Sequence, residues 1–254
     1  MSIFTALTKY SMYNEYKPHP LLSPYIAAYW VSEGYVPVET FHKILPDGCV
    51  DIVFSFNDYS PLIVGTMTTS FEITYTGKVS MMGIRFKPAG ITAFTKVPVN
   101  SFTNSHTDIS LVETIFDNYF YDILSNMTTS VMRIEYLNGY FCKKLSSVYE
   151  LDKQIVYAVG MIQLFNGNIP VAELARKSCL SQRHFERRFK FSVGIPPKSF
   201  SRIIKFRKAH ELLILRPINT LLDVAVDCGY YDHSHLIKEI KHFSGDLVAG
   251  LHSR

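Results

Sequence analysis

The sequence predicts an α+β protein of two domains, in which a small antiparallel β domain with helices precedes an all-α domain. Three observations predict this fold class. The chain has 254 residues, which is more than one domain usually contains. Up to about residue 100, apolar and polar side chains alternate with the period of two that is typical of strands. From residue 150 onward this alternation is absent, and apolar residues recur with the spacing of helices.

The predicted β domain covers residues 1–147. Its clearest strand alternates apolar and polar residues from Val50 to Phe56, directly after the turn signal Pro46-Asp47-Gly48. Two more strands, Phe71–Tyr75 and Met81–Phe86, are expected on either side of a glycine turn. Strands this short and this closely spaced favour a cupin-like barrel or a sandwich.

Helices complete the predicted β domain. Apolar residues recur with helical spacing from Ile109 to Tyr119, and a second helix is expected over 129–145. The helical pattern is interrupted at Leu145-Ser146-Ser147. We therefore place the domain boundary there and expect the second domain to cover residues 148–254.

The second domain is predicted to contain two units of the same order. Each has a short helix, a tight turn and a second helix that begins after a capping residue, Ser181 in the first unit and Asp232 in the second. Each short helix has an alanine, Ala175 or Ala225, where a small side chain lets the second helix cross closely. Two helices joined in this way form a helix-turn-helix, and a long helix, Lys198–Leu215, joins the two units.

The second helix of each unit has an apolar and a polar face. Phe185 and Phe189 lie four residues apart in the first unit, so both are expected to point inward. Leu236, Ile240 and Phe243 are expected to point inward in the second unit. The outward positions have the same spacing in both helices, which random surface charge would not produce. The alternative is that both are ordinary solvated faces of a basic helical bundle.

Positive charge is concentrated in one segment. Residues 1–149 have 10 Lys and Arg against 12 Asp and Glu, whereas residues 176–208 have 11 against one, Glu186. Such a basic block favours an anionic partner, nucleic acid first and a membrane surface second. No apolar run approaches the roughly 20 residues that a membrane span needs. We therefore expect a nucleic-acid partner and no membrane contact.

The four cysteines, Cys49, Cys142, Cys179 and Cys228, lie far apart and form no CxxC pair. This spacing favours free thiols in a reducing compartment over a disulfide framework. The first 20 residues lack the apolar core of a signal peptide. We therefore expect a cytoplasmic protein.

A long, spaced pattern covers residues 151–245. In the first unit it comprises Ala175, Ser181, Arg183, Phe185, Arg187, Phe189, Lys190, Gly194, Pro197, Phe200, Ala209, Leu212 and Leu213, and in the second Ala225, Gly229, Tyr230, Asp232, Ser234, Leu236, Lys238, Ile240, Lys241, Phe243 and Gly245. With this pattern the helical domain resembles the DNA-binding domain of the bacterial AraC-type (AraC/XylS family) transcriptional regulators.

The second unit departs from the family pattern. Leu236 and Ile240 stand where Phe is usual, and Lys238 stands where Arg is usual. After Gly245 the usual Ser/Thr-Pro and aromatic are missing, which predicts a looser end of that unit. The amino-terminal half also resembles the sensor domain of one branch of the family, through Tyr29-Trp30, Pro46-Asp47-Gly48-Cys49-Val50-Asp51-Ile52 and Gly83-Ile84-Arg85-Phe86-Lys87-Pro88.

The resemblance implies a sequence-specific DNA-binding transcription regulator with two recognition helices. The 18 residues of the joining helix span about 27 Å, which suits successive major grooves that recur every ~34 Å on one face of a duplex. Outward positions then supply the candidate sites. Base-edge readers are Gln182, Arg183, Glu186, Arg187, His233, Ser234, Ile237 and Lys238, and phosphate contacts are Ser181, Lys190 and Lys241.

Partners follow from the same interpretation. Double-stranded DNA is expected, together with an RNA polymerase contact, a homodimer and a small-molecule effector of the amino-terminal sensor-like and dimerisation-like domain. Phe54, Phe56, Tyr75, Met81 and Phe86 supply enough apolar surface for an effector pocket or for a filled core. No cofactor and no metal are expected.

The alternative function is a cupin-like, metal-dependent enzyme with a helical appendage. Its ligands would be His42, Cys49, Asp51 and His106, if the barrel brought them together. His233 and His235 are two apart on a helix, so they point in different directions and cannot share a metal ion.

Overall fold

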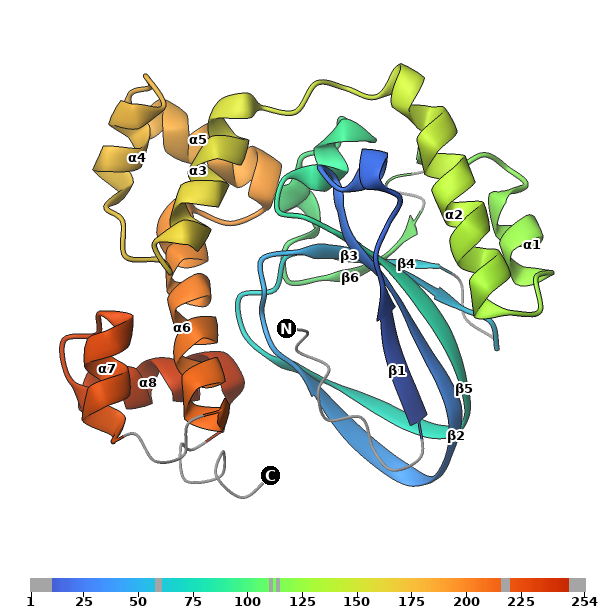
Figure 1. The fold of residues 1–254 in the computed structure, drawn as a ribbon, viewed down its shortest axis with the longest axis horizontal. Coiled ribbons are helices and arrows are strands. Elements are labelled where there is room, and N and C mark those ends of the chain that lie inside the picture. Colours follow the sequence, from blue (N-terminus) through green and yellow to red (C-terminus); the bar gives the residue numbers. More distant parts are fainter. Residues whose placement is uncertain (1–10, 58–60, 110–111, 113–114, 216–219, 247–254) are drawn as a thin grey trace.

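The two predicted parts lie side by side in a computed structural model, which describes residues 11–57, 61–109, 112, 115–215 and 220–246 (Figure 1). A β-rich part and a helical part each have a hydrophobic cluster of their own. The predicted α+β class, with an antiparallel β domain before a helical domain, is confirmed. In the described ranges, no helix has the length and apolar character to cross a membrane.

The strands form one antiparallel sheet in the order β1-β2-β5-β3-β4-β6. Their bounds are β1 Ser11–Tyr16, β2 Ile26–Ile44, β3 Val50–Ser55, β4 Leu62–Val64, β5 Phe71–Phe86 and β6 His106–Asp108. Residues 35–44 of β2 pair with residues 71–78 of β5 beyond the ends of the neighbouring strands. We call this two-stranded extension the arm; in Figure 1 it bends at the bottom of the sheet and runs back toward the helical part.

The predicted turn at residues 76–78 is wrong, because β5 runs unbroken through it. Gly77 has a φ of +71°, and the pairing with β2 shifts register between Val36 and Thr40. Glycine inside a strand commonly marks such an irregularity, where the strand bends without ending. The turn signal therefore marked a bulge in the arm.

The first helix of the β domain begins later than predicted. Regular α-helix starts at α1, Phe120–Ser125, whereas 115–119 are not α-helical and 110–111 and 113–114 lie outside the described residues. The Asp117 side chain accepts a hydrogen bond from the Tyr119 N–H, a local turn that competes with helix. The second predicted helix is confirmed as α2, Ser130–Lys144.

The interior of the β domain is filled by aromatic rings. Phe54 and Phe86 are fully buried, and Phe54 packs on Phe116 and Phe120. Phe54 and Phe86 had been considered for either an effector pocket or a filled core, and for these two residues the structure supports the filled core.

A largely buried ionic cluster joins β1, β2, β3 and β5. Arg85 pairs with Asp51 at 3.3 Å, with Asp47 at 3.6 Å and with Glu15 at 2.9 Å. The Trp30 indole N–H donates to Asp51 at 2.7 Å. Most of these residues belong to the sensor-like motifs of the sequence, so those motifs build the framework of the domain.

The structure does not support the convergence of metal ligands on which the enzyme alternative depends. Among the described residues, no three His, Cys, Asp or Glu side chains are placed to hold a metal ion. Asp51 is engaged by Arg85, and His106 packs against the ring of Phe71. The enzyme alternative therefore loses its ligand set.

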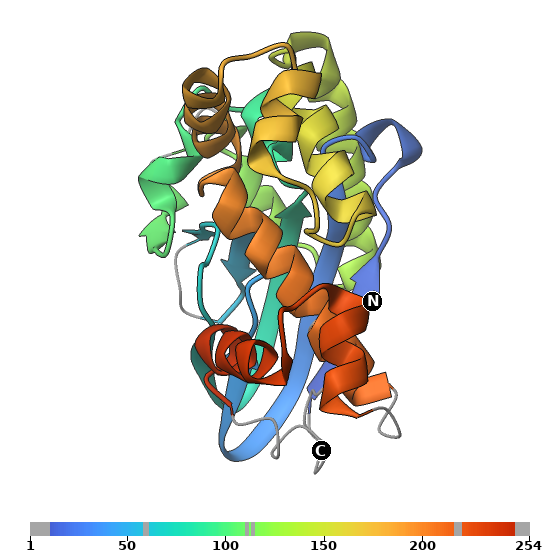
Figure 2. The same cartoon turned by 90° about the vertical axis from the view of Figure 1, so that its left-hand side faces the viewer.

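The helical domain has the predicted order of elements. Its helices are α3 Lys153–Leu164, α4 Val171–Lys177, α5 Gln182–Val193, α6 Pro197–Leu215, α7 Leu221–Cys228 and α8 His233–Ser244. In Figure 1, α6 runs vertically, with α3, α4 and α5 at its upper end and α7 and α8 at its lower end. Figure 2 gives the same arrangement from the side, with α6 crossing in front of the sheet.

Candidate nucleic-acid interface

Helix α5 is fixed at both ends and along its inner face. The Ser181 side chain accepts from the His184 N–H, and Gly194, with a φ of +93°, ends the helix. Phe185 and Phe189 are fully buried, as the sequence predicts. Arg188 makes two hydrogen bonds, of 2.7 and 2.8 Å, to Asp152, the N-cap residue of α3. Helix α5 is thereby oriented on α3.

The outward face of α5 presents basic and polar side chains to solvent. Gln182, Arg183, Arg187 and Lys190 are exposed. Glu186 is half-buried and accepts a hydrogen bond of 2.8 Å from the Gln182 amide. Two candidate base readers of the first unit thus contact each other.

Helix α8 has the same construction. The Asp232 carboxylate accepts from the His235 N–H, and Gly245, with a φ of +72°, ends the helix. Leu236, Ile240 and Phe243 are buried, as predicted. The residues beyond Asp246, which carry the departure from the family pattern, lie outside the described part of the chain.

The outward face of α8 differs from the prediction at one position. His233, Ser234, Lys238 and Lys241 are exposed, but Ile237 is half-buried and packs against the hydrophobic cluster. Ile237 follows Leu236 by one position, about 100° around the helix, at the border of the apolar face.

Ion pairing removes one arginine from the basic face. Arg202 of α6 makes two hydrogen bonds, of 3.0 and 2.7 Å, to Glu239 of α8. Glu239 is buried, so this fork–fork pair fixes the second unit on α6. The sequence analysis counted Arg202 only among the 11 basic residues of 176–208 and did not single out Glu239.

The β domain contacts the carboxy-terminal ends of both recognition helices. Thr66 donates to the Val193 carbonyl at 2.7 Å, and Thr103 donates to the Gly194 carbonyl at 2.8 Å. At the end of α8, the Ser70 N–H donates to the Phe243 carbonyl at 2.9 Å.

Two further contacts complete this interface. Lys43, in the arm, pairs with Asp246 at 2.6 Å. Gly48 has a φ of +78°, and a Cβ atom there would stand 2.3 Å from the Phe200 ring of α6. Thr66 and Thr103, with Ser70, Lys43 and Gly48, form what we call the interdomain clasp. Sequence reasoning missed it, because no local pattern marks a hydrogen bond across more than 90 residues.

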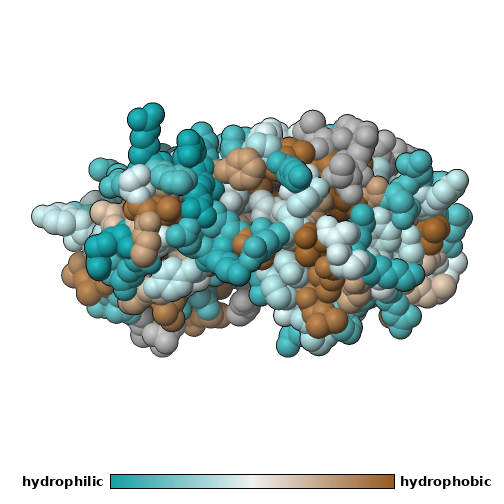
Figure 3. Space-filling view, turned by 90° about the horizontal axis from the view of Figure 1, so that it is seen from above, coloured by the Kyte–Doolittle hydropathy of each residue, from teal (hydrophilic) through white to brown (hydrophobic). Residues whose placement is uncertain are grey.

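Strongly hydrophilic residues gather over the first helical unit, as Figure 3 shows from above. Residues 176–208 supply 11 basic side chains, whereas residues 209–254 have 4 Lys and Arg against 6 Asp and Glu. Exposed arginines, an anchored helix and a second helix of the same build form a surface suited to a duplex.

Comparison with protein families agrees with this geometry. Residues 174–250 match a family described as a helix-turn-helix domain, which covers α4 to α8. The helical part of the chain therefore contains an AraC-type helix-turn-helix domain, the DNA-binding part of a transcription regulator. The amino-terminal half of the chain matches, over residues 14–108, a family described as a domain of unknown function, DUF6597.

Solved structures of ToxT from Vibrio cholerae are similar to this chain along nearly its whole length. The 1.65 Å structure has 12% identity and a TM-score of 0.42, covering 96% of this chain and 98% of that one. A structure with bound unsaturated fatty acid has 9% identity and a TM-score of 0.41, with 96% and 95% covered. A ToxT structure bound to (E)-4-(8-methylnaphthalen-1-yl)but-3-enoic acid has 10% identity and a TM-score of 0.43, and the match covers 96% of this chain and 98% of that one. No curated protein matches the chain.

Proposed function

We propose that the regulator reads two successive major-groove segments, with α5 in one and α8 in the next. The observation that carries this proposal is the common build of the two helices, each capped, buried on one side and polar on the other. The 19 residues of α6 separate the units by up to about 28 Å along its axis. That length is close to the ~34 Å between successive major grooves on one face of a duplex.

Selection of bound sequences from random duplexes tests this proposal. The selected site should contain two informative elements with centres about 10 base pairs apart, one for each helix. Replacing Lys238 by Ala should relax preference in one element only. A site with a single element, or a protein that selects no sequence at all, contradicts the proposal.

The base readers are proposed from exposure and residue type. Arg183 and Arg187 suit guanine edges, and Gln182 suits an adenine edge. On α8, His233, Ser234 and Lys238 have the corresponding exposed positions. Ser181, Lys190 and Lys241 are proposed to contact phosphates.

We further propose that the β domain modulates DNA binding through the interdomain clasp. The clasp holds α5 and α8 at their carboxy-terminal ends, whereas the readers lie nearer their amino-terminal ends. It therefore orders the two helices without covering the readers. Preordering of this kind strengthens binding, because less freedom is lost on association.

The double replacement Thr66→Val and Thr103→Val should weaken duplex binding about three- to tenfold, roughly 1 kcal/mol. Valine has the shape of threonine but cannot donate to the carbonyls at the end of α5. Fluorescence anisotropy with the selected duplex measures the effect. Thr40→Val, which removes a local hydrogen bond in the arm, is the matched control and should bind like the unmodified protein. Equal affinity in all three proteins contradicts the modulation.

The homodimer, the contact with RNA polymerase, the effector of the amino-terminal domain and the cytoplasmic location stay predictions.

A further inference from the structure

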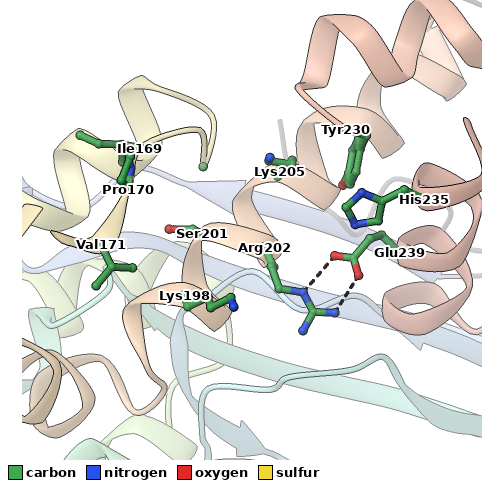
Figure 4. Close-up of a pocket in the computed structure, with 11 residues that line it drawn as sticks. Ile169, Pro170, Val171, Lys198, Ser201, Arg202, Lys205, Tyr230, His235 and Glu239 are labelled. Atoms are coloured by element: carbon green, nitrogen blue, oxygen red, sulfur yellow. Dashed lines mark hydrogen bonds and ion pairs between the residues drawn. The ribbon is translucent and has the colours of Figure 1, made fainter. Parts of the chain in front are cut away.

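A groove of about 600 Å³ lies between the two helical units, and none of the proposed base readers lines it. Figure 4 shows the start of α4 on one side, α8 and the preceding turn on the other, and α6 as the floor between them. Its residues come from both units and from α6: Ile169, Pro170 and Val171, then Tyr230, His235 and Glu239, then Lys198, Ser201, Arg202 and Lys205. A molecule bound here would contact both units.

The groove has a surplus of positive charge. Arg202 and Glu239 neutralise each other, but among the described residues no carboxylate pairs with Lys198 or Lys205. Among the described residues, the one hydrogen-bond acceptor of Lys205 is the Gly229 carbonyl, at 3.0 Å, and burial lowers the pKa of Lys205 below its usual value. An anion in the groove would favour the charged form of Lys205.

Two hydroxyl groups at the groove lack partners. Tyr230 and Ser201 are 6% and 7% exposed, and neither hydroxyl has a hydrogen-bond partner in the structure. Buried hydroxyls are nearly always hydrogen-bonded, so each of these needs an explanation. The Lys205 ammonium lies over the Tyr230 ring, 5.4 Å from the ring centroid, so a cation and an unpartnered hydroxyl group belong to the same part of the groove.

The remaining wall of the groove is apolar. Ile169 and Val171 flank Pro170 on the side opposite Tyr230. Sites for small organic ligands typically have volumes of about 300–1,000 Å³, mostly apolar walls and a few convergent polar groups. A bare inorganic ion would leave this wall unused.

We propose that this groove binds a small organic anion, a carboxylate or phosphate ester with an apolar body. Lys198 and Lys205 hold the charged group, the Tyr230 and Ser201 hydroxyls donate to it, and the apolar body lies on Pro170. The site belongs to the helical domain and does not depend on the proposed reading of DNA.

The test uses biphenyl-4-carboxylate as the probe and its neutral analogue, biphenyl-4-carboxamide, with the full chain and no DNA. Amide chemical shifts in ¹H–¹⁵N spectra should change saturably at Val171, Ser201 and Tyr230, with a dissociation constant of about 1 mM or tighter. The neutral analogue should bind at least about tenfold more weakly, because it lacks the charge that Lys198 and Lys205 recognise.

Variants make the test specific. Tyr230→Phe removes only the unpartnered hydroxyl, so it should leave the melting temperature unchanged or higher while weakening the probe severalfold. Lys198→Met should weaken the probe as well. Lys143→Met, an exposed lysine of α2, is the matched control and should bind the probe normally.

Two outcomes overturn the proposal. One is equal binding of acid and amide, or no saturable shift at the groove. The other is that the unmodified protein does not bind the probe, while Lys198→Met lowers both the affinity for duplex DNA and the dependence of log affinity on log salt. The lysines of the groove would then contact DNA phosphates. Neither outcome bears on the two-groove reading, which the selected DNA site tests separately.

Discussion

Replacing Arg85 by methionine should destabilise the folded protein by about 3–5 kcal/mol, the cost of leaving a buried ion pair without one partner. The Arg85 side chain is only 11% exposed and faces three carboxylates, of Glu15, Asp47 and Asp51. Methionine fills a similar volume but supplies no charge, so Asp47 and Asp51 would stay close together without a cation. Urea unfolding followed by Trp30 fluorescence measures the loss, because Trp30 is the single tryptophan and donates to Asp51.

The loss should depend on pH in a definite direction. Burial raises the pKa of Asp51 above its usual 3.8, and the charge of Arg85 opposes that rise. Without Arg85 this pKa rises further, so the folded state binds a proton more readily than the unfolded state does. The loss is then largest at neutral pH and shrinks as pH falls toward 3.8.

A matched control separates this effect from loss of any surface pair. Lys153 pairs with Glu150 in full contact with solvent, so Lys153→Met should unfold at the same urea concentration as the unmodified protein. If Arg85→Met is as stable as Lys153→Met, the cluster does not hold β2, β3 and β5 together.

The helical domain was predictable because its signals are local. Ser181 and Asp232 cap their helices within three residues, and Gly194 and Gly245 end them. The facing of Phe185 and Phe189 follows from a spacing of four residues. Caps and apolar spacing depend on residues only a few positions apart. The order of the helices and the side of each helix that faces the core could therefore be inferred from the sequence.

Non-local contacts explain what the sequence could not show. Gly77 looked like a turn because its local preference is the same in a turn and in a bulge, and only the pairing with β2 decides between them. The interdomain clasp joins Thr66 to Val193, a contact with no counterpart in local spacing.

The sequence therefore predicted which helices form the candidate site, but not which of their side chains contact each other. Ile237 lies at the border of the apolar face, where residue type alone cannot decide between solvent and core. Arg202 looked like one more basic residue of a cationic block, and its partner Glu239 lies 37 positions later. Exposure is a local property of a helix face, whereas pairing depends on how helices pack.

Arg187→Ala should weaken binding to the preferred duplex by about 1–3 kcal/mol and relax the preference at one base pair. Arg187 is exposed one turn after Arg183, and no ion pair engages it among the described residues, unlike its neighbour Arg188. Its guanidinium is therefore available for two hydrogen bonds to a guanine edge. Titration of the preferred duplex and of single-base variants measures both effects.

Lys190→Ala is the comparison, because Lys190 lies on the same exposed face close to the end of α5. This variant should weaken binding to all duplexes about equally. It should also reduce the slope of log affinity against log salt concentration by about 0.9, the value for one phosphate contact. Both variants should keep their helical circular dichroism, since neither side chain is buried. If Arg187→Ala weakens preferred and random duplexes alike, Arg187 contacts phosphate as well, and the base-reading face of α5 has to be sought around Gln182 and Arg183.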